Sequence, residues 1–406
     1  MSTTTLPTLA DVEAAALLLQ GVARHTPMRE ARWLSERTGG PVVFKCENVQ
    51  RAGSFKVRGA YTRMAKLTEA ERAKGVVAAS AGNHAQGVAV AAQRLGIKAT
   101  VFMPRGATIP KIEATRAYGA QVILQGDSVD GALVHAREFA GSTGATLIHP
   151  FDHTDIVAGQ GTVALEILAD LPEADTIVVC LGGGGLLAGI ALAAKALKPG
   201  IRVVGVQAAG AAAYPGSLKQ GHPVRLSQMS TMADGIAVGM PGEVPFELIS
   251  TLVDEVVTVS EEELSQALLL LLERSKLVVE PAGAAAAAAV WAHPEKFPGT
   301  TAVTLSGGNI DPLLLMRVIR HGLAAAGRYL SISIRVPDRP GSLARLLTDV
   351  SEADANVVEV EHLRTDPRLA IDEVEVGLQL ETRGAEHREQ VLAALHEHGY
   401  FVTVTA

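Results

Sequence analysis

Short apolar runs recur along the chain as far as about residue 306, and stretches of helical composition separate nearly all of them. We predict strands at residues 42–46, 75–80, 99–103, 121–124, 146–149, 176–181, 202–207, 256–260 and 301–306. The run at 176–181 is continuously apolar, which is typical of a strand buried on both faces. Strands that alternate with helices predict parallel sheets covered by helices. We therefore expect an α/β fold with two sheets, which form two lobes with a cleft between them.

The pattern changes near Gly327, where apolar and polar residues begin to alternate. Strands are predicted at 329–336, 356–363, 373–380 and 401–404, and helices at 341–353 and 387–397. The resulting order, βαββαβ, is that of a ferredoxin-like split unit. We expect a catalytic domain at residues 1–327 and a separate domain at 328–406.

Composition narrows the classes of partner and the compartment. A net charge of −7, a pI near 6.0 and dispersed basic residues argue against nucleic acid as a partner. No apolar stretch reaches the roughly 18 residues of a membrane span, and the first residues lack a secretion-signal pattern. The two cysteines, Cys46 and Cys180, fall in predicted buried strands, and no zinc-ligand spacing occurs. We expect a cytoplasmic protein without a metal site of this kind.

The segment at residues 51–60 holds a lysine, Lys56, beside Phe55 in a turn of small residues. A lysine enclosed after a strand loses hydration, so its pKa falls and its amine becomes a nucleophile. Such an amine can form a Schiff base with a carbonyl compound or with pyridoxal phosphate. The same residues also fit a lysine that begins a helix beside a packed Phe.

Four glycines, Gly182 to Gly185, follow the predicted strand at 176–181 and precede helical residues at 186–197. A strand, a glycine loop and a helix start together offer backbone N–H groups and a positive helix end to a phosphate. Tight strand-to-helix turns also use glycine, so the loop alone leaves both interpretations open.

Two further polar motifs follow predicted strands, SGGN at 306–309 and SAGNHAQG at 80–87. Ligands gather at the carboxyl ends of strands in open α/β sheets. Hydroxyl, amide and helix-start N–H groups suit an anion such as a carboxylate, although turn and capping chemistry uses the same residues.

Together the motifs resemble those of fold-type II pyridoxal-phosphate enzymes, and within that group those of threonine and serine dehydratases. The matching segments span roughly residues 20–320 and are GSFKVRGA (53–60), SAGNHAQG (80–87), FMPRGATIPK (102–111), GQGT (159–162), the tetraglycine and SGGNID (306–311). The resemblance implies a two-lobed fold like that of the tryptophan synthase β subunit, with a small lobe at about 50–145 inserted in the large lobe.

The resemblance also implies the role of each site residue. Lys56 carries pyridoxal 5′-phosphate as a Schiff base and is the catalytic base. The other implied cofactor contacts are Phe55 against the ring, Asn83 at the 3′-oxygen, Gly182, Gly183, Gly184, Gly185 and Leu186 around the phosphate, and Ser306 at the ring nitrogen. Ser80, Gly82 and His84 line the pocket for the substrate carboxylate, and a monovalent cation site built from carbonyls remains open.

The implied activity is dehydration and deamination of L-threonine to 2-oxobutanoate and ammonia, with L-serine as a poorer substrate. Serine racemase is the alternative within the fold, but Ala81 lies where racemases carry a serine as second acid/base. The stretch QAAGAAA at 207–213 also lacks the carboxylates of the racemase metal site. A catalytically silent amino-acid sensor is the alternative from another class.

The C-terminal domain resembles an ACT domain, a small amino-acid-sensing module. The motif DRPGSL at 338–343 lies at its first strand–helix junction, and the resemblance places an effector amino acid at Gly341, Ser342, Leu343 and Asn356. Such a domain can also serve only as a dimerisation plate. A homodimer or homotetramer is the family expectation.

Overall fold

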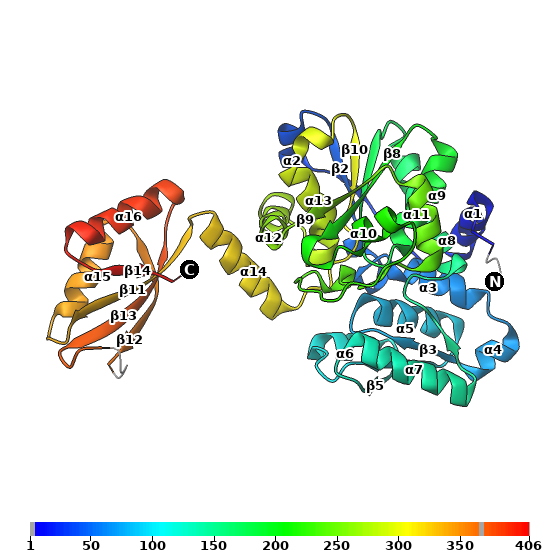
Figure 1. The fold of residues 1–406 in the computed structure, drawn as a ribbon, viewed down its shortest axis with the longest axis horizontal. Coiled ribbons are helices and arrows are strands. Elements are labelled where there is room, and N and C mark those ends of the chain that lie inside the picture. The colour runs from blue at the N-terminus through cyan, green and yellow to red at the C-terminus, as the bar shows by residue number, and fades with distance from the viewer. Residues whose placement is uncertain (1–4, 365–368, 406) are drawn as a thin grey trace. The chain divides into compact units, whose positions relative to one another are not determined.

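Three β-sheets organise the part of the chain that the computed structural model describes, residues 5–364 and 369–405 (Figure 1). Two of the sheets belong to a unit formed by residues 1–312, and the third belongs to a unit formed by residues 313–406. The α/β class and the two helix-covered sheets predicted from the sequence are confirmed for the first unit.

The larger sheet has the order β1-β2-β10-β7-β8-β9 and is parallel except at its edge, where β1 runs antiparallel to β2. Its strands are β1 (Met28–Glu30), β2 (Val42–Lys45), β7 (Thr176–Cys180), β8 (Arg202–Ala208), β9 (Glu255–Val259) and β10 (Thr301–Thr304). The sequence pattern did not predict β1, because it is three residues long and two of them are exposed. The other strands end within two residues of their predicted limits.

The smaller sheet is fully parallel, with the order β5-β4-β3-β6. Its strands are β3 (Val76–Ala79), β4 (Ala99–Met103), β5 (Gln121–Leu124) and β6 (Thr146–Leu147). Alternate residues of β3 face different helices: Val76 and Ala78 share a core with α5, whereas Val77 and Ala79 pack with α7. This two-sided burial explains why β3 is apolar at every position.

Helices cover both sheets (Figure 1). They are α1 (Leu9–Leu18), α2 (Arg32–Thr38), α3 (Lys56–Ala65), α4 (Glu69–Lys74), α5 (Asn83–Leu95), α6 (Ile109–Ala117), α7 (Val129–Thr143), α8 (Thr154–Asp170), α9 (Gly185–Leu197), α10 (Ala213–Gln220), α11 (Glu243–Leu252), α12 (Glu261–Leu270) and α13 (Pro281–Ala292). Helix α12 begins with a capping box formed by Ser260 and Glu263. No helix in the described part of the chain is long and apolar enough to cross a membrane.

Helix α3 joins the two lobes, because it packs against α5 of the small lobe and α8 of the large lobe. A buried ion network fixes its position. The Arg58 guanidinium donates to Glu47 and Glu166 at 2.8 and 2.7 Å, and the Lys45 ammonium lies 2.6 Å from Glu166. Two positive charges face two negative charges, so their attraction offsets the cost of removing them from water. The amino end of α3, which is Lys56, is thereby held between the lobes.

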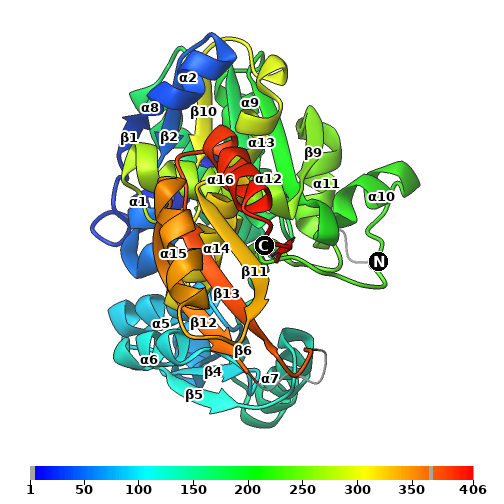
Figure 2. The ribbon, with the colours of Figure 1, turned by 90° about the vertical axis from the view of Figure 1, so that its left-hand side faces the viewer.

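The unit of residues 313–406 carries an antiparallel sheet of order β12-β13-β11-β14. Its elements are α14 (Pro312–Ala325), β11 (Tyr329–Pro337), α15 (Ser342–Glu352), β12 (Asn356–Leu363), β13 (Glu373–Glu381), α16 (Ala385–Glu397) and β14 (Val402–Val404). Helices α15 and α16 lie on one face of the sheet (Figure 2) and bury alternate residues of β11, among them Ile332 and Ile334. From β11 onward the order is the predicted βαββαβ.

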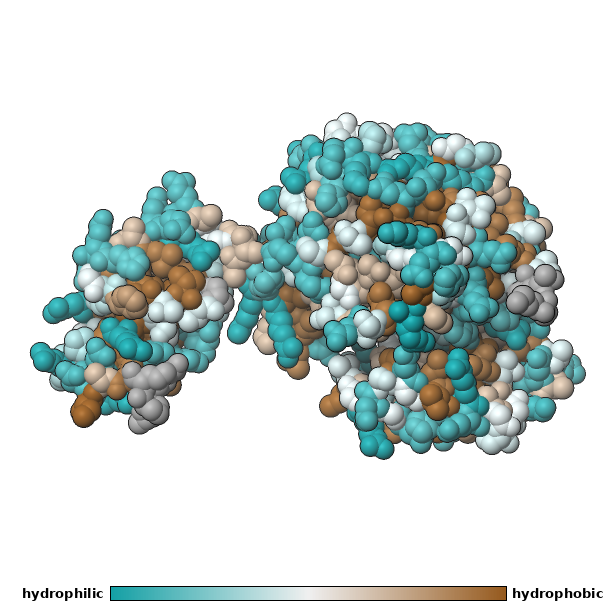
Figure 3. Space-filling view, viewed as in Figure 1, coloured by the Kyte–Doolittle hydropathy of each residue, from teal (hydrophilic) through white to brown (hydrophobic). Residues whose placement is uncertain are grey.

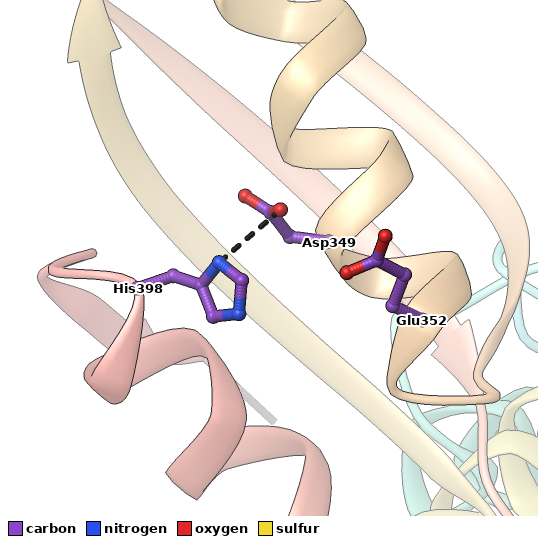
Figure 4. A group of neighbouring side chains, drawn as sticks. All are labelled: Asp349, Glu352 and His398. Atoms are coloured by element: carbon purple, nitrogen blue, oxygen red, sulfur yellow. Dashed lines mark ion pairs between the residues drawn. The ribbon is translucent and has the colours of Figure 1, made fainter.

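A group of polar side chains ties the two helices of this unit together. Asp349 on α15 accepts a hydrogen bond from Tyr400 Oη at 2.6 Å and pairs with His398 Nδ1 at 3.2 Å, and Glu352 lies beside it (Figure 4). Because both oxygens of Asp349 have protein partners, the group serves as a link between α15 and the end of α16.

Candidate active site

The predicted motifs meet where α3 begins. The Phe55 N–H donates to the Ser306 carbonyl at 3.2 Å, and Ser54 pairs with Gly307 in an isolated β-bridge. A third bond joins the Gly308 N–H to the Gly53 carbonyl at 2.9 Å. The lysine motif and the SGGN motif, about 250 residues apart in sequence, are therefore joined side by side.

Lys56 is partly buried and its Nζ donates to the Pro150 carbonyl at 3.0 Å. Nζ also lies 5.1 Å from the centre of the Phe55 ring. Burial lowers the pKa of the Lys56 amine to about 8, against the opposing effect of Cys180 and Glu280. Near neutral pH a share of this amine is therefore uncharged, which is the form that attacks carbonyl carbon.

The glycine loop connects β7 to α9, and neighbouring side chains leave no room for larger residues. A Cβ at Gly183 would collide with the Phe151 ring, and one at Gly184 would collide with the Tyr214 hydroxyl. Gly184 has a φ of 102° and caps α9 without a side-chain hydrogen bond. The first N–H groups of α9 thus keep their capacity to bind an anion. Phe151 directly follows Pro150, which accepts the hydrogen bond from Lys56. Two consecutive residues therefore contact the glycine loop and the lysine.

Ser306 lies two residues after the end of β10. Its side chain contacts Cys180, which was predicted from the sequence only as a buried strand residue. Cys180, the last residue of β7, donates from Sγ to Ser306 Oγ at 3.2 Å. Burial raises the pKa of the Cys180 thiol to about 11, so it stays protonated at neutral pH. Both the Cys180 and the Ser306 side chains are therefore polar but uncharged.

Asn83 begins α5 and is held at both ends of its amide. Its Nδ2 donates to Glu280 Oε1 at 2.5 Å, and its Oδ1 accepts from Asn309 Nδ2 at 2.8 Å. Sequence reasoning missed Glu280 as a site residue; its only local signal is a polar residue before Pro281 at a helix start. Burial raises the pKa of the Glu280 carboxyl to about 7.

The residues predicted for a substrate carboxylate occupy the turn between β3 and α5. Ser80 Oγ accepts from the Gly82 N–H at 3.1 Å, which shapes this turn. His84 is buried and its Nε2 lies 2.8 Å from the Ile148 carbonyl, while burial lowers its pKa to about 3. The imidazole is uncharged, and its partner is the residue that follows β6. The carboxylate role of these residues stays a prediction.

The residues predicted for an effector lie in the second unit. Gly341 has a φ of 91° and precedes α15, whose first residues are Ser342 and Leu343. Asn356 begins β12, and its Nδ2 donates to Glu381 at 3.3 Å. These assignments also stay predictions.

The assembled groups fit pyridoxal phosphate. A lysine amine with a lowered pKa suits a Schiff base, and the uncapped start of α9 suits a phosphate. The Ser306 hydroxyl suits a neutral ring nitrogen, because its hydrogen-bond neighbour, the Cys180 thiol, is uncharged.

Comparison with known proteins also points to pyridoxal phosphate. Residues 19–308 match the family model "Pyridoxal-phosphate dependent enzyme", and residues 330–399 match "ACT domain". The chain is 46% identical over 397 residues to the L-threonine ammonia-lyase of Thermotoga maritima, covering 98% of this chain and 99% of the relative.

Solved structures with similar folds include the processed form of threonine deaminase isoform 2 from Solanum lycopersicum, 37% identical with a TM-score of 0.74, and maize serine racemase, 34% identical with a TM-score of 0.74. The first comparison covers 79% of this chain and 91% of that chain, and the second covers 79% and 99%. The chain belongs to the family of pyridoxal-phosphate dependent enzymes, and it carries an ACT domain after the part that the family model matches.

Proposed function

We propose that this protein is a threonine ammonia-lyase, which converts L-threonine to 2-oxobutanoate and ammonia and accepts L-serine as a poorer substrate. The observation that carries the proposal is Lys56, an amine of lowered pKa that donates to the Pro150 carbonyl and follows Phe55, whose N–H bonds to the Ser306 carbonyl. The similarity to the Thermotoga maritima L-threonine ammonia-lyase along nearly the whole chain supports the choice of substrate.

When bound, pyridoxal phosphate supplies an electron sink that stabilises negative charge at the substrate Cα. Lys56 would hold the cofactor, and its Nζ, which is partly neutral near neutral pH, would remove the Cα proton. The phosphate would be held by backbone N–H groups at and before the start of α9, from Gly182, Gly183, Gly184, Gly185 and Leu186. Phe55 would lie against the ring, and Asn83 would donate to the 3′-oxygen.

Ser306 and Cys180 favour elimination over other outcomes. Both side chains are uncharged, so they offer no carboxylate to stabilise a protonated ring nitrogen. An uncharged partner at that nitrogen would favour loss of the β-hydroxyl over return of a proton to Cα. In the substrate pocket, Ser80, Gly82 and the start of α5 receive the carboxylate, with His84 beside them.

Serine racemase is the second candidate, because the fold of the maize enzyme is similar. Racemisation needs an acid on the face opposite Lys56, and the side chain at the matching position is Ala81. Alanine cannot donate a proton, which favours the lyase.

We further propose that residues 1–327 form the catalytic domain, with a small lobe at about 50–145. Residues 328–406 form a regulatory domain that binds an amino acid near Gly341, Ser342, Leu343 and Asn356. The enzyme acts as a homodimer or homotetramer, and carbonyl groups of the catalytic domain can hold a monovalent cation.

The test is to purify the protein with pyridoxal phosphate and to measure visible absorbance and product formation from threonine and from serine. We expect a yellow protein that releases ammonia and 2-oxobutanoate from threonine faster than it releases pyruvate from serine. A colourless protein without turnover would contradict the proposal and favour a catalytically silent amino-acid sensor. Formation of D-serine as fast as pyruvate would favour a racemase.

A further inference from the structure

The Asn83 side chain is fixed in one orientation by partners on both sides. Its Nδ2 donates one hydrogen to Glu280 Oε1, and its Oδ1 accepts from Asn309 Nδ2. Asn309 Nδ2 gives its other hydrogen to the Ala52 carbonyl at 2.7 Å, so it has none left to reassign. A flipped Asn83 amide would turn an oxygen toward the Glu280 carboxyl. The arrangement therefore allows one orientation, in which Nδ2 keeps a second hydrogen free to donate.

The backbone around Glu280 is built to keep its carboxyl against Asn83. The Glu280 N–H donates to the Gly307 carbonyl at 3.0 Å, and Pro281 begins α13 directly after it. A Cβ at Gly307 would collide with Glu280 Oε1 and would lie 3.0 Å from Asn83 Nδ2. The second residue of the SGGN motif must therefore lack a side chain for the Glu280–Asn83 contact to form.

The charges that face Glu280 come from several elements. Asp234, in the short helix Asp234–Ile236, raises its pKa, whereas Lys111 on α6 and Lys56 on α3 lower it. Cys180, at the end of β7, is also within electrostatic reach. Burial is the largest influence, and together these groups hold the pKa of Glu280 at about 7. Its charge therefore changes within the neutral pH range.

We propose that Glu280 is a positioning residue for the cofactor: it holds the Asn83 amide so that Nδ2, and not Oδ1, is presented to the 3′-oxygen of pyridoxal phosphate. The proposal rests on the proposed function, since it assumes that Asn83 contacts this oxygen. An ionised Glu280 holds the Asn83 N–H more firmly than a protonated one, because hydrogen bonds to charged acceptors are stronger. The environment of the bound cofactor therefore depends on the protonation of Glu280.

The test compares Glu280→Gln, Glu280→Ala, Asn83→Ala and the double variant Glu280→Ala/Asn83→Ala, with Glu295→Gln on the exposed surface as control. The readouts are the dissociation constant of pyridoxal phosphate during reconstitution and the visible absorbance of the bound cofactor from pH 5.5 to 8.5. Neither depends on turnover. Glutamine still offers an oxygen to Asn83 but cannot ionise, whereas alanine offers nothing.

We expect Glu280→Ala to weaken cofactor binding about tenfold, and the double variant to bind no more weakly than Asn83→Ala alone. Wild type and Glu295→Gln should share an absorbance change with a midpoint near pH 7, which Glu280→Gln should lack. Additive losses in the double variant, or an unchanged midpoint in Glu280→Gln, would overturn the role of Glu280. If Glu280→Ala fails to fold, the Glu280→Gln titration decides alone.

A Lys56→Ala sample separates this inference from the proposed function. If wild type takes up the cofactor with a visible band that Lys56→Ala lacks, the cofactor site stands whatever the Glu280 variants show. Failure of wild type to take up the cofactor would overturn both.

Discussion

At the scale of single residues, burial moves two groups of opposite charge toward the same pKa. The Lys56 amine falls to about 8 and the Glu280 carboxyl rises to about 7. In water these groups differ by about six pKa units. Convergent values mean that either group can gain or lose a proton near neutral pH, as an acid/base site requires.

A second consequence at this scale concerns Ala81, on the turn that precedes Asn83. Because the alanine side chain has no group that can donate a proton, wild type should form almost no D-serine during long incubation with L-serine. Ala81→Ser should increase racemisation relative to elimination, since a hydroxyl can then donate to the opposite face. Chiral chromatography of serine, with pyruvate measured in the same samples, checks the ratio. A wild-type enzyme that forms D-serine as fast as pyruvate would contradict the account.

At the scale of elements, the buried ion network fixes α3 between the lobes, and it thereby fixes Lys56, the first residue of this helix. We predict that Arg58→Met lowers the free energy of unfolding by about 3–5 kcal/mol, since it leaves buried carboxylates without their main partner. Arg63→Met, on the same helix, is the matched control; its partner Asp155 is 3.6 Å away and it should cost at most about 1 kcal/mol. Urea denaturation measures both, and equal losses would contradict the prediction.

The same network predicts an acid-sensitive stability. Burial alone would raise the pKa of Glu166, but Arg58 and Lys45 outweigh it and hold the pKa below its usual value of 4.5. A carboxyl with a lowered folded-state pKa stabilises the fold above its unfolded pKa and loses this contribution as pH falls through the folded one. Wild type should therefore lose stability below about pH 4.5, and Glu166→Gln should lose less over the same range. A parallel decline of both thermal midpoints would contradict the network's role.

An ion pair also links α6 of the small lobe to the helix Asp234–Ile236 of the large lobe. Lys111 Nζ lies 2.6 Å from Asp234 Oδ2, and the two charges act on Glu280 in opposite directions. Asp234→Asn should lower the midpoint of the cofactor absorbance titration, and Lys111→Met should raise it. Lys219→Met, on the exposed end of α10, should leave the midpoint unchanged. Shifts of Asp234→Asn and Lys111→Met in the same direction would show that Glu280 is not the group that titrates.

The sequence predicted the elements better than it predicted their contacts. The apolar run at 99–103 has the same ends as β4, because all five residues of this strand are buried and the pattern stops where burial stops. Glu280 was missed because its partner Asn83 lies 197 residues away, and no local pattern marks such a pair. Cys180 was assigned to the core for the same reason. A motif shows which chemical groups one segment contains, whereas contacts between distant segments are set only when the chain folds.

At the scale of the whole molecule, residues 1–312 and 313–406 form separate units, each with a core of its own. Hydrophilic residues dominate the visible surface of each unit, with apolar patches between them (Figure 3). A separate unit with an ACT domain is suited to carry a regulatory site, because a ligand can bind there without entering the catalytic site.

Regulation is tested at Gly341, where the backbone has a φ of 91° that valine adopts only with strain. We expect Gly341→Val to abolish the response of threonine turnover to an added amino acid and to leave unregulated turnover intact. The lost response corresponds to a coupling of about 1–3 kcal/mol, or roughly 5- to 150-fold in affinity. Gly399→Val, in the same unit at a φ of 84°, is matched for strain and should keep the response. An effect of equal size in both variants would indicate general destabilisation of the unit.

The central claim, that Lys56 carries pyridoxal phosphate for threonine deamination, is tested most directly by Lys56→Ala. The measurement follows 2-oxobutanoate release from threonine and the visible absorbance of the same sample, with Lys66→Ala, at the exposed residue directly after α3, as control. The account predicts that Lys56→Ala loses the Schiff-base band and at least about a thousandfold in turnover, because the covalent anchor and the base are removed together. Lys66→Ala should retain both. Turnover near the wild-type rate in Lys56→Ala would contradict the account.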